Sequence, residues 1–162
     1  MAKAAAKAAI ASFYGHARPA LSDCIQAGLA AYGATPASAT LQHLELFDSF
    51  HIGGSDSARH LFHNLLGEPS SEQARVIDVG CGLGGPARLL ASEWPGCSVT
   101  GVDITPEFVE VGNELSAWEG IALSDRVTLV TAAAGKVACE FKMPTLHFCL
   151  WLSCAVHPHP PI

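Results

Sequence analysis

The spacing of hydrophobic and polar positions changes near residue 75 of this 162-residue chain. Before that point, apolar residues recur three and four positions apart, which is typical of amphipathic helices. After it, short runs rich in Val and Ile alternate with helical patterns. Short apolar strands that alternate with helices predict a parallel sheet with helices on both faces.

These patterns place the individual elements. We predict helices within residues 2–32, around 41–47, and from Ser55 or Asp56 to Leu66. Strands are predicted over 75–79, 98–102 and 126–131, and the intervening helices over 85–94 and 106–119. Residues 145–154 also alternate apolar positions and can add a fourth strand. The prediction is an α/β fold with N-terminal helices and a Rossmann-like, doubly wound sheet in three α/β/α layers.

The segment Val76–Gly85 carries the most specific local pattern. A carboxylate at the end of a predicted strand is followed by Gly80, Gly82 and Gly84. Glycine lets the backbone adopt φ > 0 and approach a ligand closely. Asp103 follows the next apolar run, near the spacing at which an acid meets ribose hydroxyls in nucleotide-binding folds. The pattern predicts a nucleoside-binding βαβ unit.

Asp78 bears on which nucleoside is bound. Taken as Gly80-x-Gly82-x-x-Gly85, the loop also fits a dinucleotide fingerprint, so a nicotinamide-dependent oxidoreductase is one alternative. A carboxylate two residues before the first glycine would repel a pyrophosphate. It would attract a cofactor that has an ammonium and a sulfonium group and no phosphate. S-adenosylmethionine has this chemistry and is therefore the predicted cofactor.

The same residues resemble a known family. Asp78–Arg88 together with Val99–Val109 is similar to class I S-adenosylmethionine-dependent methyltransferases, in the small-molecule branch of sarcosine/dimethylglycine-type and tocopherol-type enzymes. Phe50–Gly54 is similar to an element that precedes the first strand in that branch. The resemblance covers about residues 13–132. It implies methyl transfer from S-adenosylmethionine to a small-molecule acceptor.

Two carboxylates and one apolar residue have expected roles in holding the cofactor. Asp78 is expected to face the sulfonium and amino groups, with bracing of the loop through backbone N–H groups as the alternative. Asp103 is expected to accept hydrogen bonds from the ribose diol, with capping of the next helix as the alternative. Ile104 is expected to pack on the adenine, or else to belong to the core. The complete predicted cofactor set is Asp78, Gly80, Cys81, Gly82, Gly84, Asp103 and Ile104.

Other reactive residues carry weaker signals. Cys81 is a small residue in a crowded turn, with no base beside it in the sequence that would make it a nucleophile. His51 is the candidate catalytic residue because imidazole titrates near neutral pH, with a buried structural histidine as the alternative. Arg59 is expected to be a solvated helix residue rather than a substrate clamp. The cysteines and histidines match no zinc spacing, so no metal is predicted.

The C-terminal part differs from the family pattern. Ala132–Ala134 stands where relatives carry an adenine-contacting aspartate, and the strands that usually follow are absent. We therefore predict three segments: a helical cap or lid (1–70), an incomplete S-adenosylmethionine-binding domain (71–133) and an atypical tail (134–162). A truncated product is the expected origin. The alternative function is an inactive binding module whose unpaired sheet edge associates with another chain.

Composition excludes several partners. The net charge of −6 gives no basic footprint for nucleic acid, and no apolar run is long enough to cross a bilayer. Six cysteines without close pairs indicate reduced thiols and predict a cytoplasmic location. The Ala- and Lys-rich N-terminus leaves an organellar targeting peptide open as an alternative.

Overall fold

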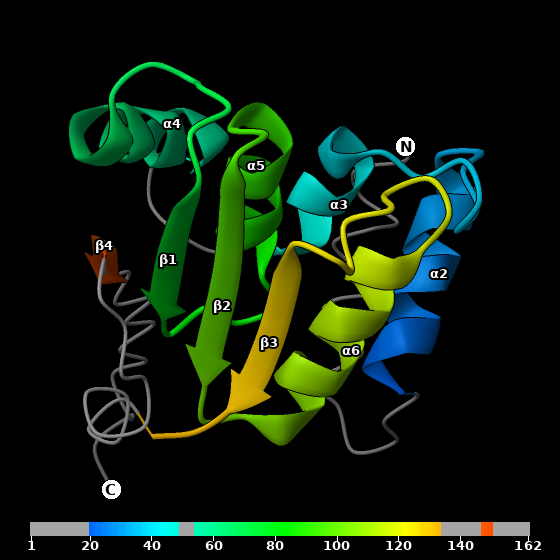
Figure 1. Ribbon diagram of the computed structural model, residues 1–162. Coiled ribbons are helices and arrows are strands. Elements are labelled where there is room, and N and C mark those ends of the chain that lie inside the picture. The colour runs from blue at the N-terminus through cyan, green and yellow to red at the C-terminus, as the bar shows by residue number, and fades with distance from the viewer. Residues whose placement is uncertain (1–19, 49–53, 134–146, 151–162) are drawn as a thin grey trace, which may run out of the picture.

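A four-stranded parallel sheet organises the computed structural model, which describes residues 20–48, 54–133 and 147–150 (Figure 1). Its strands lie in the order β3-β2-β1-β4. They are β1 (Ala74–Val79), β2 (Cys97–Asp103), β3 (Val127–Thr131) and β4 (His147–Leu150). The first three match the predicted strands within one residue at each end, and β4 falls inside the apolar run at 145–154. The predicted α/β class and Rossmann-like sheet are confirmed.

The strand order reverses at β1. From β1 the chain adds β2 and then β3 on one side, whereas β4 pairs in parallel with the opposite side of β1. This reversal makes the sheet doubly wound. In such sheets, ligands bind beyond the carboxyl ends of the strands at the point where the order reverses. That point lies between β1 and β4, directly beside the glycine-rich loop.

Both crossover helices pack on the same face of the sheet. Helices α5 (Gly85–Glu93) and α6 (Pro106–Ala117) share a core with Val76, Val99 and Leu129. The opposite face carries a separate cluster that includes Ile77 and Val102. Helices α5 and α6 therefore form one of the two helical layers of the predicted α/β/α arrangement, the layer that the described residues show. The physical reason is that two right-handed crossovers advancing in one direction place both helices on one side.

Three N-terminal helices complete this face. Helix α2 (Leu21–Ala31) packs on α6, with Leu29 and Leu115 fully buried. Helices α3 (Leu41–Asp48) and α4 (Gly54–Leu66) pack against α5. Their apolar spacing predicted them. Within the described residues no helix is both long and apolar enough to span a membrane.

Candidate functional site

Three glycines shape the loop that leaves the carboxyl end of β1. Gly80, Gly82 and Gly84 have φ values of 80°, 55° and 81°, in the left-handed region where other residues are strained. A Cβ at Gly82 would meet no atom within 4 Å, so the backbone there is open to a ligand. Gly85 is required for a different reason, because a Cβ would lie 2.7 Å from the carboxyl carbon of Asp48. The loop therefore has the backbone form that its glycine spacing predicted.

Asp103 holds the loop in place from the end of β2. Its Oδ2 accepts a hydrogen bond from the Gly82 N–H at 2.9 Å, and its Oδ1 accepts one from the Thr105 N–H at 2.8 Å. Thr105 is the N-cap residue of α6, and no described side chain caps this helix, so Asp103 orders the turn before α6 without capping the helix itself. Each carboxylate oxygen can accept a second hydrogen bond, which leaves capacity for a diol.

Asp78 is a buried carboxyl group without a hydrogen-bond partner among the described residues. Only 3% of the residue is exposed, and neither Oδ1 nor Oδ2 accepts a hydrogen bond there. The alternative in which it braces the loop through backbone N–H groups is therefore not seen. Burial, and secondarily the negative charge of Asp103, raises the pKa of Asp78 to about 7. Its surroundings have no room for a water molecule and are formed by Phe62, Val76, Pro86, Ala87, Leu90 and Val99.

The two remaining members of the predicted cofactor set, Cys81 and Ile104, differ in exposure: the first is buried and the second is exposed. Cys81 packs its side chain into the core, where burial raises the pKa of its thiol. A protonated, buried thiol is not a nucleophile, and only the backbone of Cys81 is placed to contact a ligand. Ile104 is 73% exposed although it is a large apolar residue. It follows Asp103, the last residue of β2, directly in the chain.

A pocket of about 350 Å³ lies between α3, α4 and α5, next to the glycine-rich loop. Its lining includes Glu45, Ser55, Arg59, Gly85 and Pro86. Glu45 Oε1 accepts a hydrogen bond of 2.6 Å from the Ser55 hydroxyl. Arg59 is paired with Glu93 at 2.8 Å and with Asp56 at 3.1 Å, so its charge is balanced by protein groups. His51, the predicted catalytic residue, lies outside the described residues.

A buried ion pair under the loop was not anticipated from the sequence. Arg88 of α5 is completely buried, and its Nη2 donates a 2.7 Å hydrogen bond to Asp48 Oδ2. Its Nη1 donates to the carbonyl of Gly112 and the hydroxyl of Ser116 on α6. Arg88 thus links α3, α5 and α6 behind the glycine-rich loop. The sequence offered one sign of this buried ion pair. Asp48 follows Leu44 by four residues, so this charged residue lies on the apolar face of α3.

The fold and site together define a Rossmann-like ligand-binding domain, and comparison with protein families specifies it. The model of the methyltransferase domain family matches residues 76–161, more than half of the chain. The chain belongs to this family. The match continues to residue 161, past the point near Ala132 where the resemblance was expected to end.

Individual relatives match over shorter segments. The chain is 41% identical over 70 residues to sterol 4-C-methyltransferase from Caenorhabditis elegans, covering 43% of this chain and 20% of that protein. It is 36% identical over 64 residues to trans-aconitate 2-methyltransferase from Streptomyces avermitilis, covering 38% of this chain and 24% of that protein. It thus spans about a quarter or less of these relatives. A solved phosphoethanolamine N-methyltransferase 2 from Haemonchus contortus, in complex with S-adenosyl-L-methionine, is 30% identical with a TM-score of 0.42, covering 51% of this chain and 18% of that one.

Proposed function

We propose that this chain is an S-adenosylmethionine-dependent methyltransferase that acts on a small molecule. One observation carries the proposal: a buried carboxyl group without a hydrogen-bond partner among the described residues lies under a three-glycine loop, where the strand order reverses. Buried polar groups normally have partners, so an orphaned carboxyl indicates a missing ligand or cation. Membership of the methyltransferase domain family supports the same conclusion.

The chain's own groups fit this cofactor. Gly82 presents open backbone to the methionine end, and Asp103 has free acceptor capacity for the ribose diol. The exposed face of Ile104 provides an apolar surface for the adenine. Asp78 lies below the loop rather than on its surface, so it acts through its charge on the bound cation. When bound, S-adenosylmethionine supplies an electrophilic methyl group on its sulfonium.

The pocket between α3, α4 and α5 is the proposed acceptor site. Its volume of about 350 Å³ suits a small molecule, and Gly85 joins it to the loop. Glu45, already oriented by Ser55, provides a polar group that can hold an acceptor hydroxyl or amine. Alignment of acceptor and methyl group supplies much of the catalysis in such a transfer, so no nucleophilic side chain is needed. His51 remains the proposed base that assists deprotonation.

A comparison of two ligands tests the role of Asp78. S-adenosylmethionine and S-adenosylhomocysteine differ by the methyl group and the positive charge on sulfur. Calorimetric titration at pH 8 should show that Asp78→Asn weakens binding of the sulfonium ligand about tenfold or more and that of the neutral thioether less. Asp125→Asn, which removes an exposed carboxylate outside the site, should change neither affinity. Equal losses for both ligands would show that Asp78 does not act through charge.

The rival functions predict different results. Methyl transfer from radiolabelled S-adenosylmethionine to a panel of small amines, phenols and carboxylic acids should give a labelled product. Binding without transfer to any acceptor would favour the inactive binding module. Binding of NAD in preference to S-adenosylhomocysteine would favour the oxidoreductase.

Assembly and location form a separate part of the proposal. We propose self-association through a sheet edge, because β4 and β3 each pair on only one side within the described sheet. A cytoplasmic location is supported by Cys81 and Cys97, which form no disulfide with a described residue. We also propose that the chain divides into a helical cap or lid (1–70), an incomplete S-adenosylmethionine-binding domain (71–133) and an atypical tail (134–162).

A further inference from the structure

Two arginines at the amino-terminal end of the sheet have no carboxylate partner among the described residues. The described part of the chain contains four arginines and no lysine. Arg59 and Arg88 form ion pairs with Glu93 and Asp48, whereas Arg75 and Arg126 form none with a described residue. This is unexpected in a chain with 15 acidic and 9 basic residues, where acids are in excess. Both unpaired arginines line one pocket of about 530 Å³.

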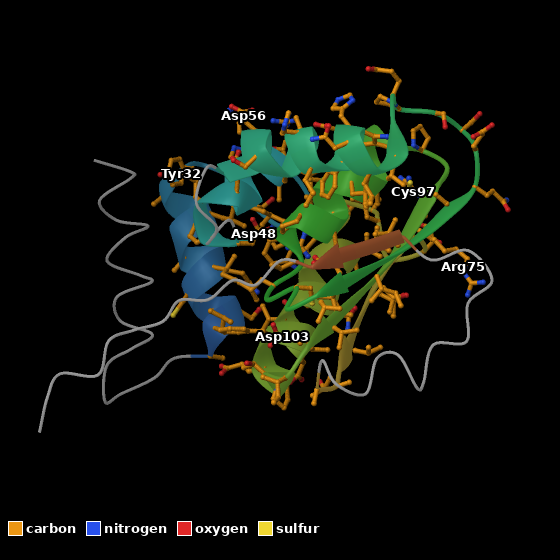
Figure 2. All side chains as sticks on the ribbon, turned by 90° about the vertical axis from the view of Figure 1, so that its left-hand side faces the viewer. Tyr32, Asp48, Asp56, Arg75, Cys97 and Asp103 are labelled. Atoms are coloured by element: carbon orange, nitrogen blue, oxygen red, sulfur yellow. The ribbon has the colours of Figure 1, made fainter. Side chains whose placement is uncertain are left out.

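The strand register brings these residues together. Arg75 on β1 is directly opposite Ser98 on β2, and the Val99 N–H donates a 2.7 Å hydrogen bond to the carbonyl of Arg126 on the other side. Arg75 and Arg126 are therefore separated by two strand spacings, about 10 Å. Both residues line the same pocket at this end of the sheet. Figure 2 shows that Arg75 and Cys97 lie far from Asp103, at the opposite end of the sheet.

The position of the Arg126 side chain is fixed by neutral groups. Its Nη1 donates hydrogen bonds to the carbonyl oxygens of Ala91 and Pro95 near the end of α5. A positive charge is favourable near a helix C-terminus, but carbonyl dipoles do not neutralise it. Its Nε and Nη2 form no hydrogen bond with a described residue. The guanidinium of Arg126 is thus held in place, and the N–H groups on its Nε and Nη2 can donate to a ligand.

We infer that this pocket is a second binding site, for a small molecule that bears a phosphate group. Arginine presents several donors in a planar fork that matches phosphate, and two arginines match a dianion. The hydroxyl groups of Ser71 and Ser98 add neutral donors, and no carboxylate lines the pocket among the described residues. Its volume is in the range of small-molecule sites and exceeds that of a single phosphate ion. Because it lies at the amino-terminal end of the strands, it is separate from the proposed cofactor crevice.

Titration of the full chain with inorganic pyrophosphate tests the site. We expect pyrophosphate to bind, and we expect Arg75→Gln to weaken this binding at least tenfold because it removes one of the two positive charges. Arg75 is exposed, so its replacement spares the core. Arg59→Gln removes the same charge outside the pocket and should leave the affinity within about twofold. Succinate, a dicarboxylate without phosphate, should bind at least tenfold more weakly than pyrophosphate. The affinity for pyrophosphate should stay unchanged when S-adenosylhomocysteine is added, at sub-stoichiometric or at saturating concentration.

A measurement on the unaltered protein gives an independent check. Phenylglyoxal modifies accessible arginines, and bound pyrophosphate should protect Arg75 and Arg126 but not Arg59 from it. Absence of pyrophosphate binding, equal losses in the two variants or protection of all three arginines would overturn the inference. So would succinate binding as tight as pyrophosphate, or competition between pyrophosphate and S-adenosylhomocysteine.

Discussion

Asp78 makes the stability of the unliganded protein depend on pH. Its pKa rises from 3.8 in the unfolded chain to about 7 in the fold, so the folded state favours the neutral acid. The folded state then binds more protons than the unfolded state between these values, and stability falls as pH rises from about 4 to 7. The loss is at most about 4 kcal/mol, since one pKa unit corresponds to 1.36 kcal/mol.

Asp78→Asn should remove this dependence. Urea unfolding of the two proteins should give similar free energies near pH 4 and a more stable variant at pH 8, by roughly 2–4 kcal/mol. Parallel pH profiles for the two proteins would mean that the folded protein does not disfavour ionisation of this carboxyl.

The Asp48–Arg88 pair contributes to stability through a different balance. Removal of one partner leaves an uncompensated buried charge, so Asp48→Ala should cost about 3–5 kcal/mol. Asp56→Ala is the matched control, because Asp56 pairs with Arg59 in solvent, and should cost less than about 1 kcal/mol. Chemical denaturation measures both. Asp48→Leu combined with Arg88→Met should recover much of the loss, and a further loss instead would contradict the desolvation argument.

At the scale of elements, Asn113 of α6 covers part of the outer edge of β3. Its Nδ2 donates a 2.9 Å hydrogen bond to the carbonyl of Leu129, and its Oδ1 accepts a 2.8 Å hydrogen bond from the N–H of the same residue. The side-chain amide thus pairs with the strand as a neighbouring backbone would. Because this satisfies both backbone groups of an edge residue, β4 is the edge that favours the proposed self-association.

Asn113→Ala should expose the Leu129 backbone groups and destabilise the fold by about 1–3 kcal/mol. Sedimentation velocity at increasing protein concentration should also show more dimer than in the unaltered chain. Asn64→Ala, at an exposed position on α4, is the control and should change neither property. Unchanged association in Asn113→Ala would indicate that the edge of β3 does not limit self-association.

Local sequence patterns predicted the helices and strands well, but they predicted the contacts between these elements less well. Val76, Ile77 and Val79 identify β1 because their β-branched side chains suit a strand buried on both faces. The spacing of Gly80, Gly82 and Gly84 predicted a loop with positive φ, since no other residue adopts that form without strain. The Arg88–Asp48 pair could not be derived, because it joins residues 40 positions apart through the packing of α3 on α5. The burial of Asp78 likewise depends on the side chains of α4 and α5.

For the whole molecule, binding of the proposed cofactor must appear as added stability. A ligand that binds only the folded state at 100 times its Kd stabilises it by about 2.7 kcal/mol. For a chain of this length that corresponds to a rise in Tm of roughly 5–10 °C. Scanning calorimetry with saturating S-adenosylhomocysteine should show this shift, and NAD at the same concentration should show none. A larger shift with NAD would contradict the methyltransferase proposal and favour the oxidoreductase. The glycine loop alone fits both ligands, whereas the charge of Asp78 and the family match favour S-adenosylmethionine.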